Sequence, residues 1–449
     1  MTYIEFVDNC AIENLCAELT YPADRVILVG CELEILNKHC SQYSKIMAAK
    51  GMNTSFVPVV VSDDSLKAVV TTLEELVKKE VEGGEECVID LTGGNDLHLT
   101  AAGIVYGKLF DEYKGINLVR FDVVNRTVID EDGDGLPEFP RVPDITVEDN
   151  VSIYGGRVIY EKEKKGTTHR WNVDDRLIKD VSALWEICRK NSEWNVQTSL
   201  LETVESDSVV AYKRGNVTEC DLQKLDMAFN ESGKNGDDRS AAKHSNGISA
   251  TFLDKLVAAG FLKEYSLTGG RLKLVYRDGD AKRYITKSGQ ALEMAVFVAV
   301  SCMKNPDGTK KYGDVMTGVT IDWDGKIVEK NGYSADSAWY LNTKKDTKNE
   351  IDVFAMKGMV PIFISCKNGR VEMEELYKLD TVAKRFGGKY GQKILVAPNL
   401  NKRNQFTWEL LARAKDMGIK VLYENVRKNT VFELQGRLDD VIDSCFKKK

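Results

Sequence analysis

The chain has 449 residues, of which 43% are hydrophobic and 29% are charged, as is ordinary for a globular protein of about three domains. No stretch approaches ~18 consecutive apolar residues, and the first residues, MTYIEFVDNC, show no basic region before an apolar run. We therefore expect a cytoplasmic protein without a membrane segment. The ten cysteines include no C-x-x-C pair, which argues against a zinc ribbon or a disulfide framework.

The net charge of −7 is unevenly distributed along the chain. Residues 1–150 hold 12 Lys and Arg against 28 Asp and Glu, a balance of −16. Residues 350–449 hold 19 against 13, a balance of +6. A basic C-terminal region suits contact with a phosphate backbone, although a solvated lysine-rich surface has the same composition.

Residues 1–150 alternate between short apolar runs and amphipathic stretches. The apolar runs, typical of strands, are Tyr3–Val7, Val26–Val29, Ser55–Val61, Cys87–Leu91 and Asn117–Phe121. The stretches with helical spacing are Ala11–Leu19, Glu32–Lys50, Asp64–Val81 and Asp96–Tyr113. This alternation predicts a Rossmann-like α/β domain, with a parallel sheet and helices on both faces. Ligands of such sheets bind beyond the carboxyl ends of the strands, where the first strand leads into the polar turn Asp8-Asn9.

One strand end, in the sequence VIDLTGGNDLHLTAAG (residues 88–103), is a candidate ligand site. The strand leads directly into a helix through Thr92, Gly93, Gly94 and Asn95. The two glycines allow a ligand to approach the backbone, and the helix N-terminus offers N–H groups to an anion such as phosphate. The segment matches neither the Walker motif nor the dinucleotide fingerprint. An ordinary strand–helix turn with Asn95 as its N-cap is the alternative.

Residues 176–285 resemble a small helical module that ends in a hairpin. The segment ISATFLDKLVAAGFLKEY (248–265) predicts an amphipathic helix stopped at Gly260, and strands are predicted near Arg271–Tyr276 and Lys282–Thr286. A helix, a glycine stop and a two-stranded wing resemble a winged helix-turn-helix. Such modules bind DNA or serve only as dimer or linker modules, and this one lacks a clear basic recognition helix.

The segment NEIDVFAMKGMVPIFISCKNG (349–369) predicts a β-hairpin. Ile351–Met356 and Val360–Cys366 have the composition of strands, and Lys357–Met359 forms the turn between them. The strands are apolar, so the charged residues at the open end of the hairpin are unusual for a buried hairpin and are candidates for a functional site.

Those polar residues are Glu350 and Asp352 on one strand and Ser365 and Lys367 on the other. Because side chains alternate along a strand, each pair shares one face. A turn centred near Gly358 places Asp352 roughly opposite Ser365, one step from Lys367. A solvated charge pair at a sheet edge is the alternative to a functional site.

The elements around the hairpin follow an order found in nucleases. A nearly all-apolar helix (288–303) precedes the hairpin and carries Glu293, which needs a partner if it is buried. After the hairpin we expect a helix, a strand, a second helix and a second strand: Glu372–Phe386, Lys393–Ala397, Asn404–Asp416 and Lys420–Tyr423. The order in residues 286–449 resembles the restriction-endonuclease-like α/β core of PD-(D/E)xK nucleases.

That resemblance assigns a role to each polar residue. In such sites carboxylates hold a divalent metal, Mg²⁺ or Mn²⁺, and a lysine handles the attacking water and offsets charge in the transition state. Asp352, Glu293 and Glu350 would be the metal ligands, and Lys367, Asp352 and Glu293 the catalytic residues. The sequence departs from the motif at Ser365, a poor metal ligand that stands where the second acid is usual.

The two motifs together, VIDLTGGNDLHLTAAG and NEIDVF…PIFISCKNG, resemble the CARF-domain nucleases that accompany type III CRISPR systems. The resemblance covers nearly the whole chain in domain order. It implies a CARF sensor that binds a cyclic oligoadenylate, with cyclic tetra-adenylate the favoured ring, across a homodimer with one symmetric pocket. The turn Thr92, Gly93, Gly94 and Asn95 matches the family's ligand-binding turn, and Asp8 and Asn9 match its first-strand loop less closely.

The resemblance implies an activity as well. Ligand binding would rotate the nuclease domains and assemble metal-dependent cleavage of DNA or RNA phosphodiester bonds. One alternative is a nucleotide-sensing transcriptional regulator that binds DNA through the winged helix and has an inactive nuclease-like domain. Another is a small-molecule α/β enzyme that uses the Thr92 turn, which lacks a suitable nucleophile–base pair.

Overall fold

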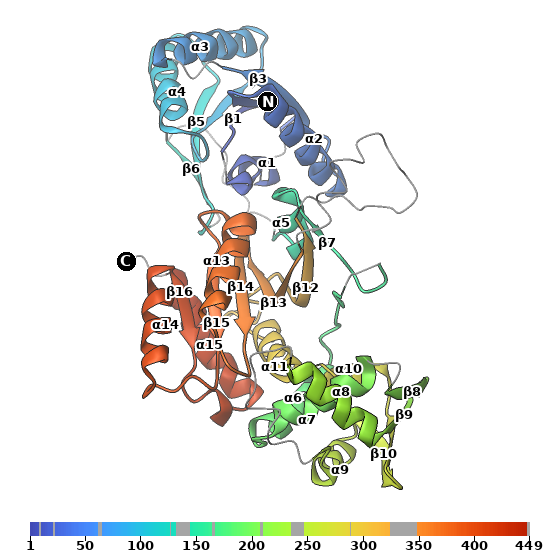
Figure 1. The fold of residues 1–449 in the computed structure, drawn as a ribbon. Coiled ribbons are helices and arrows are strands. Elements are labelled where there is room, and N and C mark those ends of the chain that lie inside the picture. Colours follow the sequence, from blue (N-terminus) through green and yellow to red (C-terminus); the bar gives the residue numbers. More distant parts are fainter. Residues whose placement is uncertain are drawn as a thin grey trace. The chain divides into compact units, whose positions relative to one another are not determined.

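The computed structural model of the chain describes residues 1–8, 10–20, 23–61, 65–125, 127–131, 144–163, 167–206, 210–234, 247–287, 289–323 and 348–446 (Figure 1). The chain divides into two compact units, each assembled from separate stretches of sequence. Unit 1 comprises Met1–His169, Lys311–Phe363 and Lys378–Lys393, and unit 2 comprises Arg170–Lys310, Ile364–Tyr377 and Ile394–Lys449. The predicted domains 1–150, 176–285 and 286–449 stay predictions.

The N-terminal sheet of unit 1 has six strands in the order β3-β2-β1-β4-β5-β6. The strands are β1 (Thr2–Phe6), β2 (Arg25–Gly30), β3 (Ser55–Val60), β4 (Cys87–Asp90), β5 (Ile116–Asp122) and β6 (Thr127–Asp130). The first five strands pair in parallel, and β6 is antiparallel to β5. Strands β1 and β4 are buried along their whole length, as their near-continuous apolar runs require of strands covered on both faces. The predicted parallel sheet is confirmed.

Helices cover both faces of this sheet (Figure 1). They are the 3₁₀ helix η1 (Ala11–Asn14) and the α-helices α1 (Cys16–Thr20), α2 (Leu33–Ala49), α3 (Leu66–Glu82) and α4 (Asp96–Leu109). Helices α3 and α4 bury Leu73 and Val105 in one core with Ile27 of β2 and Ile89 of β4. The strand order reverses at β1, so right-handed crossovers place α1 and α2 on the other face. At such a reversal the carboxyl ends of adjacent strands leave a crevice for a ligand.

A second six-stranded sheet has the order β16-β15-β14-β13-β12-β7. Its strands are β7 (Arg157–Val158), β12 (Asp314–Asp322), β13 (Lys348–Lys357), β14 (Val360–Cys366), β15 (Gln392–Val396) and β16 (Ile419–Leu422). Strands β13 and β14 are the two arms of the predicted hairpin, and Gly358 takes a left-handed conformation in its turn (φ 64°). The sequence did not indicate β7 or β12, which pair antiparallel with each other.

The helices that accompany this sheet are α5 (Val147–Ile153), α11 (Gln290–Ser301), α13 (Met373–Gly387), α14 (Gln405–Asp416) and α15 (Val431–Phe446), together with the 3₁₀ helix η2 (Val426–Lys428). Helix α11 packs between α15 and α6 (Asp175–Arg189) in unit 2, which accounts for its nearly all-apolar sequence. In the parts of the chain that the structure describes, no helix has the length and apolar character needed to cross a membrane.

The remainder of unit 2 contains a four-stranded antiparallel sheet in the order β10-β11-β9-β8. Its strands are β8 (Ala211–Arg214), β9 (Val217–Asp221), β10 (Leu262–Thr268) and β11 (Arg271–Tyr276). The helices around it are α7 (Trp194–Ser206), α8 (Leu222–Lys234), α9 (Ala250–Ala258) and α10 (Gly279–Ile285).

The predicted helix is present and ends at Ala258, just before the predicted stop at Gly260, but the sequence did not indicate β10, which follows. One prediction for this region is wrong. The predicted strand Lys282–Thr286 lies almost wholly in α10, whose start is fixed by Asp278, because that carboxylate accepts the N–H of Ala281. The wing is therefore the β10–β11 hairpin, closed by two glycines with positive φ between these strands.

Candidate functional site

A cavity of about 460 Å³ opens in unit 1 at the carboxyl ends of β1, β2 and β4. Residues that follow these three strands form one side of it: Val7, Asp8, Gly30, Cys31, Glu32, Gly94 and Asn95. The other side comes from α2, from the segment after α5 and from α13. The cavity lies where the strand order reverses, the usual ligand site of such sheets, and is our candidate ligand site.

The predicted ligand residues divide into two groups. Asp8, Gly94 and Asn95 line the cavity, whereas Thr92 and Gly93 are not part of its wall. Asn9 lies outside the described residues. The structure thus brings the first-strand loop and the turn after β4 together, as the sequence predicts for residues that follow adjacent parallel strands.

Asn95 has a structural role as well as a place in the cavity wall. It is the N-cap of α4, and its side-chain oxygen accepts the backbone N–H of His98 at 2.9 Å. Asn95 is thus the N-cap that the alternative predicts, while its place in the cavity wall keeps the ligand role a prediction. Because the oxygen is used by the helix, the amide N–H₂ is the part of Asn95 that can donate to a ligand.

The two glycines serve the packing of the turn. Gly94 has a φ of +111°, and a Cβ there would lie 2.7 Å from Cβ of Phe6 in β1. A Cβ on Gly93 would lie 3.1 Å from the carbonyl oxygen of Phe6 and 3.2 Å from Nδ2 of Asn14. The glycines let the turn approach β1, so a bulky residue at Gly93 would disturb the fold and is a poor probe of ligand contact.

Thr92 is held inside the turn. Its hydroxyl bonds to the Asp90 carboxylate and accepts the backbone N–H of Phe121 at 2.7 Å. The backbone N–H of Thr92 also donates to Asp90, at 2.7 Å. In this conformation Thr92 joins the ends of β4 and β5 and shapes the turn from behind the cavity.

The cavity wall carries charged residues of both signs. Lys38, His39 and Arg385 supply the basic groups, and Asp8 and Glu32 supply the acidic ones. Burial, helped by the nearby Lys38 charge, lowers the pKa of His39, so this imidazole is neutral at neutral pH. The lasting positive charges of the wall are therefore those of Lys38 and Arg385.

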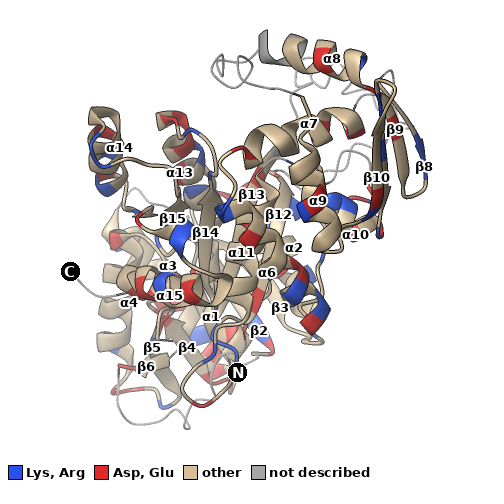
Figure 2. Cartoon of the chain, turned by 90° about the horizontal axis from the view of Figure 1, so that it is seen from below, with Lys and Arg blue, Asp and Glu red and all other residues tan. Residues whose placement is uncertain are grey.

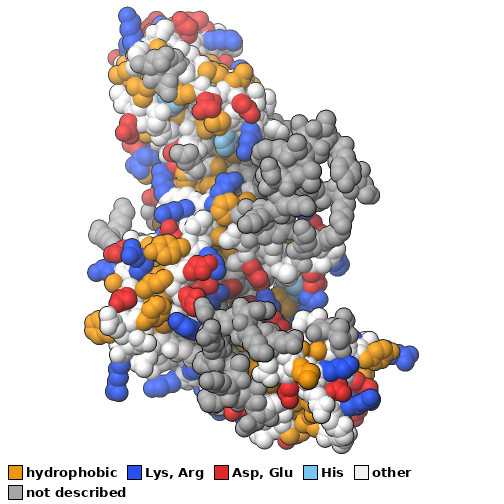
Figure 3. All heavy atoms as spheres, viewed as in Figure 1, with side chains coloured by type: hydrophobic (Ala, Val, Ile, Leu, Met, Phe, Trp, Pro, Cys, Tyr) orange, Lys and Arg blue, Asp and Glu red, His pale blue; other side chains and the backbone are white. Residues whose placement is uncertain are grey.

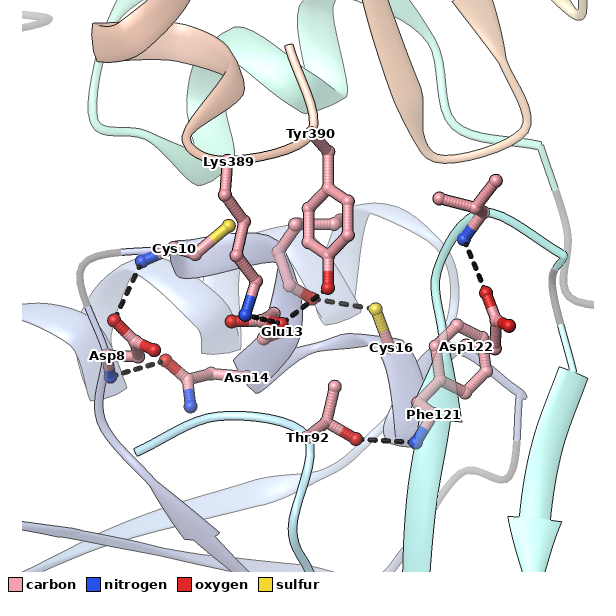
Figure 4. A network of polar contacts seen from close by, with 12 residues as sticks. Asp8, Cys10, Glu13, Asn14, Cys16, Thr92, Phe121, Asp122, Lys389 and Tyr390 are labelled. Carbon is pink, nitrogen blue, oxygen red and sulfur yellow. Dashed lines mark hydrogen bonds and ion pairs between the residues drawn. The ribbon is translucent and has the colours of Figure 1, made fainter. Parts of the chain in front are cut away.

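The loop after α13 contacts the segment that follows β1, including η1 (Figure 4). Glu13, which is 1% exposed, accepts the Tyr390 hydroxyl at 2.5 Å and lies 2.7 Å from the Lys389 ammonium. Burial raises the pKa of Glu13, and these two partners partly offset the rise. Gly388 has a φ of +52°, and a Cβ there would lie 2.7 Å from Cys10 Sγ. The loop is thus closely packed against Cys10 and Glu13, next to Asn14 and Gly93.

Three further acids are fully buried close to one another in the N-terminal sheet domain. Glu5 of β1, Glu18 of α1 and Asp90 of β4 are each 0% exposed. Burial raises the pKa of all three, to about 8 for Glu18 and about 6 for Asp90, and takes that of Glu5 well above its usual range. A pKa of about 8 means that Glu18 is mostly protonated at neutral pH.

The candidate metal ligands in unit 1 are Glu350 and Asp352 of β13. Burial alternates along this strand: Ile351 and Val353 are buried, Glu350 is exposed and Asp352 is half-buried. The two carboxylates thus share the accessible face, as predicted. The register of β12 and β13 places Gly318 opposite Asp352, and Gly318 has a φ of +59° and no side chain to fill the space.

Glu350 and Asp352 place two carboxylates on one face of β13. Within the described residues, no group of three or more His, Cys, Asp or Glu side chains is arranged to hold a metal ion. Mg²⁺, however, is commonly held by one or two carboxylates, with water and substrate phosphate as the other ligands. Glu350 and Asp352 fit that donor set. A cation bound there would polarise a phosphate ester and lower the pKa of a coordinated water.

Lys367 lies in unit 2 at the end of β14. Its ammonium is 3.3 Å from the carboxylate of Glu375 in α13, and its backbone N–H donates to the carbonyl oxygen of Val396 at 2.9 Å. The next residue, Asn368, is 3% exposed, and its side-chain oxygen accepts a guanidinium N–H of Arg427 at 3.0 Å. The backbone at Lys367 is therefore well fixed, while its side chain is half-buried and within reach of an acid.

Glu293, the third predicted metal ligand, also belongs to unit 2. It lies in the first turn of α11 and is 6% exposed. Lys287 provides the partner that a buried glutamate needs, with its ammonium 3.8 Å from the carboxylate. The assignment of Glu293, Lys367 and Asp352 to one active site stays a prediction.

Two solved structures match nearly the whole chain. Protein VC1899 from Vibrio cholerae has 16% sequence identity and a TM-score of 0.65, with 99% of this chain and 98% of that chain covered. Can2 from Sulfobacillus thermosulfidooxidans, solved in complex with cyclic tetra-adenylate, has 14% identity and a TM-score of 0.62, with coverage of 98% and 99%. The chain has the fold of Can2. The predicted fold class is thereby confirmed, although no protein-family model and no curated protein matches the chain.

Within the fold shared with Can2, the cavity includes residues that sequence reasoning missed. Lys38, His39 and Gln42 lie on the helix after β2, and Arg385 lies on α13. The first three follow a strand end and recur with helical spacing, a signal that the sequence does contain. Arg385 comes 230 residues after Gly155, the wall residue nearest to it in the sequence, so only the three-dimensional structure places it in this wall.

Proposed function

We propose that the chain is a metal-dependent endonuclease, activated by a cyclic oligoadenylate, that cleaves DNA or RNA in the cytoplasm during type III CRISPR antiviral defence. The observation that carries this proposal is the cavity beyond β1, β2 and β4, in a chain that shares the fold of a protein solved with cyclic tetra-adenylate. The activator is cyclic tetra-adenylate, bound by Asp8, Asn9, Gly94 and Asn95.

The size and chemistry of the cavity support this ligand. Its volume of about 460 Å³ lies in the lower part of the range for drug-sized ligands, about 300–1,000 Å³, so a ring of four nucleotides needs more than one such cavity. A homodimer with two-fold symmetry provides two. The start of α4, with Asn95 as its cap, points backbone N–H groups and a positive dipole end at bound phosphate.

The hydrolytic site lies on the hairpin of β13 and β14 in this proposal. Asp352 and Glu350 hold Mg²⁺ or Mn²⁺, with Glu293 as the third carboxylate, and Lys367 orients the attacking water and offsets charge on the phosphate. The glycine across from Asp352 leaves room beside that carboxylate for water or a phosphate oxygen.

The test is a cleavage assay. The protein is incubated with plasmid, single-stranded DNA and RNA, with Mg²⁺ or Mn²⁺, in the presence and absence of cyclic tetra-adenylate. We expect cleavage of at least one substrate, which needs both the metal and the ring. Intact substrates in every lane that contains both would contradict the endonuclease.

The β10–β11 hairpin after α9 favours a second candidate, a nucleotide-sensing regulator whose middle module binds DNA. That candidate predicts duplex binding that changes with the ring and no cleavage. A gel-shift assay in EDTA beside the cleavage assay separates the two.

A further inference from the structure

We propose that Arg385, on the last turn of α13, is a ligand-binding residue of the cavity and takes a phosphate group of the bound anion. The inference rests on the proposed function for the identity of the ligand, but it concerns a residue outside the N-terminal sheet. It would make α13 part of the sensor's binding site.

The position of Arg385 comes from the cavity wall, where it faces residues of α2 and of the segment after α5. A Cβ on Gly155 would lie 3.8 Å from Nη2 of Arg385 and 3.8 Å from Oε1 of Gln42. Gln42 is in turn fixed by a 2.6 Å hydrogen bond from its amide to the carbonyl oxygen of Ile153. Arg385 therefore lies beside the polar groups of this wall.

The Arg385 guanidinium makes few polar contacts within the described protein, so it is available to a ligand. Among the described residues, its guanidinium has one hydrogen bond, a long one of 3.5 Å to the carbonyl oxygen of Trp323, and no ion pair with a carboxylate. The preceding residue, Lys384, is 72% exposed and pairs with Asp380 at 2.7 Å. Two adjacent cations on one helix thus differ: one is paired on the surface, and the other faces a cavity.

Burial makes this arrangement costly without an anion. Arg385 is half-buried, and burial lowers its pKa, yet a guanidinium stays protonated at neutral pH. A partly desolvated cation is stabilised when an anion accepts its hydrogen bonds. The planar guanidinium fork matches two oxygens of a phosphate group, which makes a phosphate the best-suited partner.

The end of α13 is fixed against the N-terminal sheet domain, so Arg385 is held in place. The carbonyl oxygen of Phe386 accepts an amide N–H of Asn150 at 2.7 Å. Lys389 and Tyr390 bind Glu13 just beyond the helix (Figure 4). A preorganised cation loses little side-chain entropy when the ligand arrives, so it contributes more to affinity.

Helix α13 also begins close to a candidate catalytic residue. Glu375, in its first turn, is the partner of Lys367. One helix therefore carries a cavity residue in its last turn and the acid that binds Lys367 in its first. A phosphate bound by Arg385 would therefore contact the same helix, α13, that holds Glu375, the ion-pair partner of Lys367.

The experiment compares Arg385→Met with Lys384→Met in the full-length protein. Isothermal titration with cyclic tetra-adenylate should show an affinity roughly 10- to 100-fold lower for Arg385→Met, because a hydrogen bond to a charged group is lost. Lys384→Met should bind as the wild type does, since the Lys384 side chain is exposed, pairs with Asp380 and is not part of the cavity wall. Arg385→Lys, which keeps the charge but not the fork, should lie between them.

The outcomes separate this inference from the proposed function. Equal affinities for wild type and Arg385→Met would overturn the role of Arg385 and leave the activator in place. Failure of the wild type to bind the ring would contradict the proposed activator, and titration with pyrophosphate then tests Arg385 by itself. Pyrophosphate binding that Arg385→Met loses would support the anion site; no binding in the wild type would overturn it. If Arg385→Met is poorly folded by circular dichroism, the same comparison is made with Arg385→Lys.

Discussion

Two regions of unit 1 differ in how far their acidic residues are buried. In the N-terminal sheet domain, Glu5, Glu18 and Asp90 are fully buried, and burial raises the pKa of each. On β13, Glu350 and Asp352 lie on the accessible face. Burial favours the neutral form in the first group, whereas the second group lies on a face that water and ions can reach.

This difference bears on how residues 1–150 would bind the proposed anionic ring. Their formal charge of −16 counts every carboxyl as ionised, but burial raises the pKa of Glu18 to about 8 and that of Glu5 well above its usual range, so the charge at neutral pH is less negative. Figure 3 shows acidic and basic side chains interspersed over the N-terminal sheet domain in its upper part, rather than one continuous acidic face. Helices α13 and α14 likewise carry both signs (Figure 2). The local balance at the cavity, with Lys38 and Arg385, matters more than the total.

The largest effect is expected at the accessible acids. Asp352→Asn should lose the divalent cation and lower ring-stimulated cleavage by about 10²–10³-fold, because a bound metal contributes several kcal/mol to the transition state. Lys367→Ala should lower the rate to a similar extent while keeping the metal. Cleavage rates and metal-dependent melting shifts measure the two effects separately.

Lys357→Ala, at the turn of the same hairpin, is the matched control and should cleave at the wild-type rate. Ring affinity should stay unchanged in all three variants. If Asp352→Asn and Lys367→Ala both cleave like wild type, the hairpin is not the active site, and the contrast between the two groups of acids has no catalytic meaning.

A smaller effect is expected when an acid is placed in the cavity. Asn95→Asp keeps an oxygen that caps α4, so stability should hold, but it removes the amide donor and adds a negative charge beside the ligand. We expect ring affinity to fall roughly 10- to 100-fold. Titration calorimetry measures the affinity and thermal melting measures the stability.

Asn95→Ser is the control, since serine caps a helix without adding charge. It should bind the ring more tightly than Asn95→Asp. If Asn95→Asp binds the ring as tightly as the wild type, the cavity tolerates a further negative charge. Local charge at the cavity would then not limit ring binding, and the protonation of the buried acids would not matter for affinity.

Most of the secondary structure could be predicted because the apolar residues recur with clear periods. The exceptions have physical causes. β12 escaped prediction because it contains Gly318, and glycine weakens the strand pattern. β10 escaped prediction because its sequence, LKEYSLT, suits a helix about as well as a strand, and only pairing with β11 decides between them.

The candidate site could be predicted only in part. Asp8 and Asn95 follow strand ends, so the topology of a parallel sheet brings them together. The Thr92 hydroxyl accepts the backbone N–H of Phe121, a residue of another strand, and Arg385 reaches the cavity wall only through the packing of α13. Neither contact has a local pattern in the sequence.

The smallest effect is expected at the buried acids, and it depends on pH. The pKa of Glu18 is about 8 in the folded protein, above its ordinary value near 4.5, so between these pH values the folded state binds a proton that the unfolded state does not. The contribution of Glu18 to stability therefore falls as the pH rises from about 4.5 to about 8. Glu18→Gln, which is neutral and similar in shape, should remove this dependence.

We expect Glu18→Gln to melt close to wild type at pH 5 and roughly 3–6 °C above it at pH 8, a gain on the order of 1–2 kcal/mol. Glu34→Gln, on the exposed face of α2, should keep the wild-type pH profile and serves as the control. Scanning calorimetry at pH 5, 6.5 and 8 gives the three profiles. A constant difference between Glu18→Gln and wild type across this range would mean that Glu18 is already ionised in the folded protein. The buried acids would then add more negative charge to the N-terminal sheet domain, and bound phosphate would need more positive charge than Lys38 and Arg385 provide.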